Sequence, residues 1–331
     1  MRKVGLDLCR VIGCLGVVMI HTVMLFWDFD PASPVWAAYN ALSASVRFSV
    51  PLFFLLSGAL LLGRETLELK RHLRRTLHFV LMFYLWSLIC HGIDRLWLHV
   101  WNEGSFLDAV SGGYYHLWFL PAMALCYCAM PLLHALVHAD RQAVLRGAGV
   151  LAAILAALGL LRLTPLAPAA RAFDFRYLLY LGYVLLGWAL SRRKLPKWVP
   201  AALVPAAVAA IAVTAHLNRL DALRLGQAST RYYGYLTVSA ALGAAAVFAL
   251  CLRCERLPAK AAAVLRRLSG CVFGVYLLHP LFIDLLRSRH LDFTRFSALW
   301  FFPLCYVCFL LLSLAVTALL RRIPGLRKLV S

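Results

Sequence analysis

Residues 6–26 read LDLCRVIGCLGVVMIHTVMLF, and this stretch decides the fold class of the chain. It is apolar enough, and at about 20 residues long enough, to cross a bilayer as one α-helix. It nevertheless carries Asp7, Arg10 and His21, although a charged residue at the centre of a span costs about 2.5–3.5 kcal/mol on insertion scales. Such residues usually face a protein interior or a polar cavity. We predict that this helix forms one wall of a polar path.

Helical geometry places the ionisable side chains of this stretch on one stripe. At about 100° per residue, the spacing Arg10-x10-His21 returns to within about 20° of the same direction, with an axial rise of about 16 Å. Asp7 precedes Arg10 by three positions and can pair with it. Gly13 and Gly16 leave a smooth surface that another helix or a ligand can approach closely.

The composition of the whole chain is that of a membrane protein. Of its 331 residues, 63% are hydrophobic and only 15% are charged, and the mean hydropathy is +0.79. A soluble globule of this composition would expose large apolar areas. The formal net charge of +20 comes from short clusters between apolar spans, so it indicates membrane topology and contact with lipid rather than nucleic-acid binding.

Hydropathy predicts an all-α, polytopic bundle of about ten transmembrane helices in one domain, residues 1–331, with no separate soluble domain. The sixth and seventh spans are short for a bilayer about 30 Å thick. The segments predicted to be cytoplasmic hold about twice as many Lys and Arg residues as the outer loops, which favours a cytoplasmic N-terminus and C-terminus. The predicted spans are 7–26, 38–62, 76–98, 114–133, 144–161, 176–190, 199–215, 232–252, 269–286 and 297–320.

Arg47 lies within the second predicted span, at a depth comparable to that of His21. Two basic groups without a nearby carboxylate favour a neutral His21, which is the form that a general base needs. Arg47 could instead bind a phosphate or an oxyanion. It could also simply extend to the outer headgroups, because it is only about two turns from the helix end.

The loop after the second span contains the basic residues Arg71, Arg74 and Arg75. Such a cluster commonly fixes topology and touches anionic lipid. The spacing Arg71-x-x-Arg74 also places two guanidinium groups on one helix face, where they could grip phosphates. A nucleotide-bearing cofactor would suit them.

Two further histidines lie in predicted spans. His116 opens the fourth span in YYHLWFLP, where it and Trp118 could be either interfacial residues or ligand-binding residues. His279 lies near the middle of the ninth span, directly before Pro280, which interrupts the helical hydrogen bonds, so we predict a functional role for it. Asp284 could pair with a neighbouring helix or cap the outer end, and its role stays open.

Motifs for other chemistries are missing from the sequence. The chain has ten Cys, and we interpret even the pairs with x-x spacing as core or lipid-facing residues, because they fall in apolar helices. There is no Gly-rich phosphate loop, no GxSxG motif and no carboxylate-rich cluster for a two-metal site. We therefore expect no metal.

Five segments in order resemble the acyltransferase-3 family of integral-membrane acyltransferases. The resemblance runs from the first predicted helix to the ninth, and so covers nearly the whole chain. The segments are Arg10-x10-His21, VPLFFLLSG at 50–58, Arg71-x-x-Arg74, HLWFLP at 116–121 and GVYLLHP at 274–280.

This resemblance implies a function and roles for the site residues. The family transfers an acetyl group from cytoplasmic acetyl-CoA to a sugar hydroxyl, on a cell-surface polysaccharide or its lipid-linked precursor, at the outer face of the bacterial inner membrane. His21 would be the catalytic histidine and Arg10 its motif partner, while Arg71 and Arg74, with Arg75 beside them, would belong to the acetyl-CoA site.

Roles are also expected for the other candidate residues. Arg47 or His279 would stabilise the developing oxyanion, and His116 and Trp118 would contact the acceptor. An acetyl-histidine intermediate is an alternative to direct transfer.

Two other classes of function also fit the polar stripe. A transporter or flippase of a lipid-linked sugar could use His21, Arg10 and Asp7 as a proton relay, although such a protein has less need of Arg71-x-x-Arg74. An enzymatically inert scaffold would tolerate replacement of all these residues. The sequence leaves open the acceptor sugar, the oligomeric state, and whether the acyl group is acetyl or another short chain.

Overall fold

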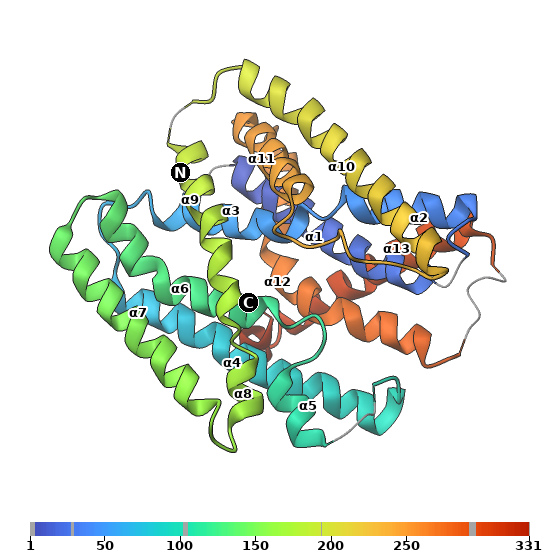
Figure 1. Ribbon diagram of the computed structural model, residues 1–331, viewed down its shortest axis with the longest axis horizontal. Helices are drawn as coiled ribbons and strands as arrows, with labels where there is room; N and C mark the ends of the chain where they lie inside the picture. The colour runs from blue at the N-terminus through green and yellow to red at the C-terminus, as the bar shows by residue number, and fades with distance from the viewer. Residues whose placement is uncertain (1–3, 28–29, 102–104, 193, 291–295, 331) are drawn as a thin grey trace. The chain divides into compact units, whose positions relative to one another are not determined.

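The computed structural model describes residues 4–27, 30–101, 105–192, 194–290 and 296–330, and all regular elements in these ranges are helical (Figure 1). The predicted all-α class is therefore confirmed. The chain forms two compact units, Met1–Leu56 with Ala189–Ser331, and Ser57–Trp188. A single domain over 1–331 stays a prediction. Arg2, Lys3, Arg193 and Arg295, which contribute to the charge distribution, lie outside the described residues.

The first unit is built around its N-terminal helix. This helix, α1, packs against α11, α12 and α13, while α10 lies along α11 and α2 (Figure 1). The elements of this unit are α1 (Val4–Val23), η1 (Met24–Phe26), α2 (Pro34–Ser45), the first part of α3 (Ser49–Leu61), α10 (Trp198–Leu225), α11 (Val238–Arg253), α12 (Ala259–Arg287), α13 (Ala298–Leu320) and η5 (Leu326–Leu329).

The second unit has α6 at its centre, with α4, α7 and η3 packed against it (Figure 1). Its elements are the rest of α3, α4 (Leu69–Ile93), the π-helix η2 (Asp94–Leu98), α5 (Phe106–Gly112), α6 (Phe119–Val137), α7 (Arg141–Leu161), α8 (Ala167–Arg171), η3 (Phe175–Tyr180) and most of α9 (Leu181–Ser191).

Local sequence explains where several helices begin and end. Ser33 caps α2, because its Oγ accepts a hydrogen bond from Trp36 N (3.1 Å) and Pro34 fits the first helical turn. Asp140 caps α7 in the same way through Ala143 N (3.0 Å). Gly226 ends α10 in a left-handed conformation (φ +67°), which glycine adopts without a Cβ clash.

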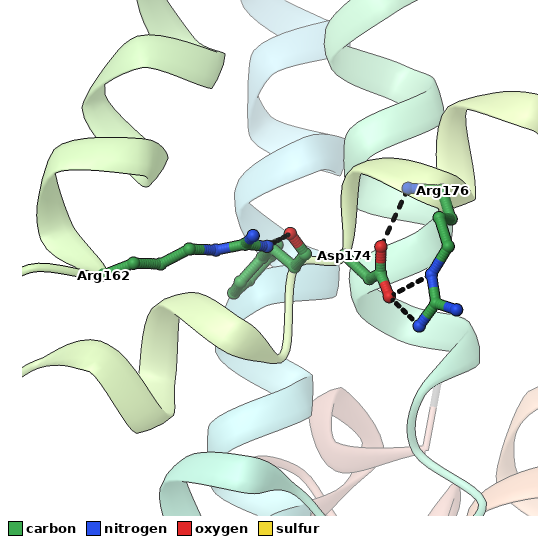
Figure 2. Close-up of polar contacts among 4 residues, drawn as sticks. Arg162, Asp174 and Arg176 are labelled. Atoms are coloured by element: carbon green, nitrogen blue, oxygen red, sulfur yellow. Dashed lines mark hydrogen bonds and ion pairs between the residues drawn. The ribbon is translucent and has the colours of Figure 1, made fainter.

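Polar contacts also hold the beginning of η3 in the second unit (Figure 2). Asp174 accepts hydrogen bonds from Arg176 N (2.9 Å) and from Nε of the same residue (2.8 Å). Arg162 reaches from the end of α7 to donate to Phe173 O (3.0 Å), and its guanidinium lies 4.3 Å from the centre of the Phe175 ring. The Arg176 guanidinium beside Asp174 holds the pKa of that carboxyl below its usual value.

Eight helical stretches in the described ranges are long and apolar enough to cross a membrane. Eight of the ten predicted spans thus have a matching helical stretch, including the seventh, whose helix α10 has 28 residues. The sixth span corresponds to η3 and the 11-residue α9, and the eighth to the 16-residue α11, which are shorter. The count of ten and the cytoplasmic termini stay predictions.

The second predicted span, 38–62, differs from the structure in one respect. It is two helices, because the chain turns at residues 46–48 between α2 and α3. Pro51 has no N–H to donate to the carbonyl of Arg47, so an unbroken helix could not make that hydrogen bond. Ser45 and Ser49 bond through their hydroxyls to the carbonyls of Leu42 and Val46, which further supports the break. Arg47 therefore lies in the turn and not within a continuous helix.

The glycine stripe of α1 allows another helix to approach, as expected from the sequence. A Cβ at Gly16 would collide with Ser49 Oγ, and a Cβ at Gly13 would lie 3.0 Å from the Phe53 ring. Both contacts belong to the first turns of α3, so the beginning of α3 approaches α1 closely at these two glycines.

Candidate active site

His21 and His279 meet in the first unit, from α1 and α12. His21 Nδ1 lies 2.6 Å from His279 Nε2, and the two rings are stacked with their centres 4.9 Å apart. His279 has no exposed surface, whereas His21 is half-buried. The two histidines that the sequence placed in different predicted spans thus form one hydrogen-bonded pair.

The hydrogen-bond partners fix the tautomers of this pair. His279 Nδ1 lies 3.0 Å from the backbone carbonyl oxygen of Val275, and a carbonyl can only accept, so Nδ1 carries the hydrogen. In the neutral ring, His279 Nε2 is then the acceptor, and His21 Nδ1 is the donor between the two rings. The unprotonated nitrogen of a neutral His21 is consequently Nε2, which is the atom that could accept a proton from a substrate.

Pro280 helps to explain the orientation of His279. Proline has no N–H, so it cannot donate the helical hydrogen bond to the carbonyl of Tyr276. The His279 ring bends back onto the same turn of α12, where it bonds to Val275 O and also interacts with the Tyr276 carbonyl. The proline that the sequence marked as a helix interruption therefore adjoins the side chain that orients His21.

Arg10 is held near the beginning of α1 by a buried carboxylate. Its Nη1 lies 2.7 Å from Asp7 Oδ1, which confirms the predicted pairing. Asp7 is almost fully buried and also accepts from Ser269 Oγ of α12 (2.7 Å). Both hydrogen bonds go to Asp7 Oδ1, so this buried oxygen holds the Arg10 guanidinium nearly two turns after the start of α1 and links it to α12.

Arg47 is anchored in the turn between α2 and α3. It donates from Nη2 to Ser43 Oγ (2.7 Å), and its guanidinium lies 4.5 Å from the centre of the Tyr233 ring. Tyr233 is itself buried and donates to the backbone carbonyl of Asn40 (2.7 Å). Arg47 is close enough to His21 for their charges to interact. Its predicted role as an oxyanion partner is compatible with this position but stays a prediction.

A second cation near His21 was not singled out in the sequence. Arg287, at the end of α12, also interacts electrostatically with His21 and lies 3.9 Å from the buried carboxylate of Asp284. The i, i+3 spacing of Asp284 and Arg287 in the sequence could have predicted this ion pair. Asp284 thus has an ion-pair partner on its own helix, and its pairing with a neighbouring helix stays a prediction.

The predicted cofactor arginines lie in the second unit, on the first turns of α4. Arg71 and Arg74 are exposed, Arg75 is half-buried, and Arg71 Nη1 makes a weak ion pair with Glu68 (3.4 Å). The exposed guanidiniums are not needed to hold the core together, so this surface can bind an anion or lipid headgroups.

His116 and Trp118 belong to an aromatic cluster of the second unit. His116 is only 1% exposed, so it is not a lipid-facing belt residue, and it contacts the Tyr115 ring at 5.5 Å between centres. Trp118 is half-buried and lies against the rings of Tyr177 (5.8 Å) and Tyr180 (6.0 Å). Amphipathic rings of this kind can contact a polar ligand with an apolar face.

A basic cavity beside the first turn of α1 was not predicted from the sequence. It has a volume of about 550 Å³ and is lined by Gly5, Arg192, Lys194, Arg253 and Glu255 among others. Lys194 pairs with Glu255 (3.2 Å). From the sequence, these Lys and Arg residues indicate only membrane topology. Their spacing does not show that residues 4–5, 191–192, 194–195 and 252–255 come together in the fold.

The described residues offer no evident metal site. Among them, no group of three or more His, Cys, Asp and Glu residues could hold a metal ion, and all ten cysteines are free thiols that are buried or half-buried. Their burial agrees with the interpretation that they are core or lipid-facing residues.

The sequence of this chain matches that of a known protein family. A family model described as an acyltransferase domain, that of the acyltransferase-3 family, matches residues 3–322. The chain belongs to this acyltransferase family. With its long apolar helices, it is a multi-pass membrane acyltransferase. The family match spans all the candidate residues of both units.

One curated protein shows partial similarity. An amino-acid racemase of Enterococcus faecalis is 29% identical to this chain over 132 residues, which are 37% of this chain and 18% of the racemase. The chain therefore spans less than a fifth of that protein, and the racemase activity is not transferred. No solved structure matches the chain significantly.

Proposed function

We propose that this membrane acyltransferase is an O-acetyltransferase that uses acetyl-CoA. Its acceptor would be a hydroxyl group of a cell-surface polysaccharide or of a lipid-linked sugar precursor, at the outer face of a bacterial inner membrane. The family match supports acyl transfer in general, while the donor, the acceptor and the membrane are our inference.

The hydrogen bond between His21 and His279 is the observation on which this proposal depends most. It orients His21 so that Nδ1 donates to His279 and Nε2 is the proton acceptor. A neutral imidazole with a fixed acceptor nitrogen is what general-base activation of an alcohol requires.

The chemical step then follows from the proposed roles. His21 Nε2 takes the proton of the acceptor hydroxyl as its oxygen attacks the thioester carbonyl, and an O–C bond forms. The tetrahedral intermediate collapses with cleavage of the C–S bond, and the CoA thiolate receives the proton from His21. The products are an O-acetyl ester and CoA, so no net proton is gained or lost.

Arg47 is our candidate for stabilising the oxyanion of the tetrahedral intermediate. Its charge is near enough to act on His21, and its guanidinium is held by Ser43 and Tyr233. His279 has both ring nitrogens engaged, by His21 and by Val275 O, so we assign it to orienting His21. Direct transfer is our preferred sequence of events; an acetyl-histidine intermediate would require His21 Nε2 itself to attack the thioester.

The donor phosphates have two candidate partners. One is the exposed cluster of Arg71, Arg74 and Arg75 at the start of α4, which the family resemblance favours. The other is the cavity lined by Arg192 and Arg253 beside the first turn of α1, which lies in the same unit as Arg10 and His21. Guanidinium groups bind phosphates through paired, charge-assisted hydrogen bonds, which suits either place.

The proposed acceptor site consists of residues of the second unit, and the proposed acceptor is inferred from sequence similarity. We propose that His116 and Trp118, with the tyrosines beside Trp118, contact the sugar. The runs SVPLFFLLSG and YHLWF resemble those of the enterobacterial common antigen O-acetyltransferase, so that surface glycan is the first acceptor to test.

The decisive experiment is acetyl transfer in proteoliposomes with labelled acetyl-CoA and a lipid-linked glycan acceptor. We expect label in the glycan with the wild-type protein and a loss of at least about 10²-fold with His21→Ala, because the general base is removed. His138→Ala, which changes an exposed histidine outside the site, serves as the matched control and should keep full activity.

The outcomes separate the proposal from its rivals. A His21→Ala protein that inserts normally and still acetylates at the wild-type rate would end the proposal. Movement of the lipid-linked sugar across the bilayer without acetyl-CoA, lost in Asp7→Asn or His21→Ala, would instead indicate the transporter or flippase with its proton relay. Absence of both acetyl transfer and sugar movement in the wild-type protein itself would favour the inert scaffold.

A further inference from the structure

A second basic cavity lies between the beginning of α12 and the end of α13, in the first unit. Its volume is about 610 Å³, and it is lined by Ala263, Arg266, Arg267, Cys271, Ala318 and Arg321. It is thus lined by three arginines and by no acidic residue. The charge distribution of the sequence predicts that this end of both helices is cytoplasmic.

Among the described residues, the three arginines have no acidic partner. Throughout the described ranges, no ion pair involves Arg266, Arg267 or Arg321, and the hydrogen bond of Arg321 goes to the thiol of Cys271 (3.3 Å). A thiol is a weak acceptor, and it carries no charge to offset a guanidinium. Like charges around one cavity repel each other, and an anion between them would relieve that repulsion.

The Arg321 side chain is placed over a residue that leaves room for it. A Cβ at Gly270 would lie 2.7 Å from Arg321 Nη1, so the guanidinium lies directly against the backbone of α12. Arg321 is half-buried in this position, whereas Arg266 and Arg267 are exposed. The cavity is therefore lined by one half-buried guanidinium and two exposed ones.

Apolar surface adjoins this cavity on both helices. Val264 of α12 is 54% exposed and Leu319 of α13 is 57% exposed, and each directly follows a lining residue. Leu312, one heptad before Leu319 and within about 20° of it on the helix, is also exposed. A cationic cavity whose lining residues are followed in the chain by exposed apolar residues matches a molecule with an anionic head and hydrocarbon chains.

We propose that this cavity binds the phosphate group of an anionic phospholipid. The phosphate would receive hydrogen bonds from Arg321 and from Arg266 or Arg267, while the acyl chains would lie along α13 over Leu319 and Leu312. No residue of this lipid site belongs to the proposed donor or acceptor sites. The proposal of a lipid site therefore does not depend on whether the acceptor is a glycan.

Native mass spectrometry of the full-length, delipidated protein can test this site. Phosphatidylglycerol or phosphatidylcholine is added back to wild type, to the triple variant Arg266→Gln, Arg267→Gln, Arg321→Gln, and to Gly270→Ala. We expect a discrete one-to-one adduct of phosphatidylglycerol on wild type and not of phosphatidylcholine. The triple variant should bind more weakly by on the order of 100-fold, since each basic residue near an anionic lipid contributes about fivefold.

Two controls address charge and folding. The triple variant Arg322→Gln, Arg327→Gln, Lys328→Gln removes the same charge from exposed residues beyond the cavity and should keep the adduct. Gly270→Ala keeps every charge but displaces Arg321, so it should weaken the adduct even if the triple variant does not fold.

Three results would overturn the proposal. The first is equal binding of phosphatidylcholine, and the second is an adduct that survives both the triple variant and Gly270→Ala. The third is binding of ADP, and not of phosphatidylglycerol, that the triple variant abolishes. That result would reassign the cavity to the phosphates of the nucleotide-bearing donor.

Discussion

The two ring nitrogens of His279 have different partners, and this difference determines what the residue can do. One nitrogen is tied to the carbonyl of Val275 and the other to His21. Both nitrogens are thus used to hold the neighbouring imidazole in one tautomer and one orientation. At this scale the proposed chemistry depends on which nitrogen of His21 carries a hydrogen, and the hydrogen bond to His279 determines which one it is.

Replacing His279 should therefore damage turnover more than binding. We expect His279→Ala to lower kcat for acetyl transfer on the order of 10²-fold with little change in KM for either substrate, because His21 loses its fixed tautomer. His279→Gln should recover part of the rate, since its amide oxygen can accept from His21 Nδ1. Steady-state kinetics of the three proteins check this, and equal losses in Ala and Gln variants would contradict it.

Asp174 gives a prediction with a defined pH range. Its folded pKa is lowered by Arg176, so the carboxylate stabilises the fold above its ordinary pKa of about 4, and this stabilisation is lost as the pH falls through the lowered folded value. Asp174→Ala should cost about 1 kcal/mol at pH 7, mostly from the lost cap on η3, because the exposed Arg176 pair contributes little.

Thermal unfolding in detergent measures this effect. The gap between wild type and Asp174→Ala should be present at pH 7 and should shrink at pH 3. Glu65→Gln removes an exposed carboxylate of the same unit and should leave the unfolding temperature unchanged at both pH values. A gap for Asp174→Ala that persists at pH 3 would refute the assignment.

At the scale of elements, the site depends on how closely α1 and α3 approach. The break at residues 46–48 lets α3 begin beside Gly13 and Gly16, and it leaves Arg47 in a turn instead of along a straight helix. Irregular backbone inside a membrane is tolerated where protein or a polar cavity surrounds it. The close contact of α1 with α3 and the turn that carries Arg47 are thus two consequences of one helix break.

A methyl group at Gly16 should disturb this arrangement. Gly16→Ala would press against Ser49, so we expect a destabilisation of about 1–3 kcal/mol and reduced acetyl transfer. Gly149 of α7 has open space around it, and Gly149→Ala should be neutral or stabilising by up to about 1 kcal/mol. Thermal unfolding of both variants checks the contrast, and an unchanged Gly16→Ala protein would show that α1 and α3 are not in close contact.

At the scale of the whole molecule, the two units supply different parts of the proposed reaction. The first contains His21, His279, Arg10 and Arg47, and the second contains the arginines at the start of α4 and the aromatic cluster around Trp118. The family match covers both units, so each is expected to contribute to acyl transfer.

Kinetics can assign the donor phosphates to one of the two units. If the α4 cluster binds them, Arg71→Gln with Arg74→Gln should raise KM for acetyl-CoA about tenfold or more at nearly constant kcat. Arg192→Gln with Arg253→Gln should then behave like wild type, and the reverse pattern would assign the donor to the cavity beside α1. If neither pair of substitutions changes KM for acetyl-CoA, neither cluster binds the donor phosphates, and both basic clusters only set the membrane topology.

The sequence by itself determined the membrane class, the all-α fold, the Asp7–Arg10 pair and the glycine stripe, because each depends on residues within a few helical turns. It also selected His21 and His279 separately, since ionisable groups inside apolar spans need a reason. Only the tertiary structure decided that these two histidines are partners, because they are 258 residues apart and helical periodicity carries no information across that separation. The same holds for Arg266, Arg267 and Arg321, which line one cavity only when α12 and α13 pack together.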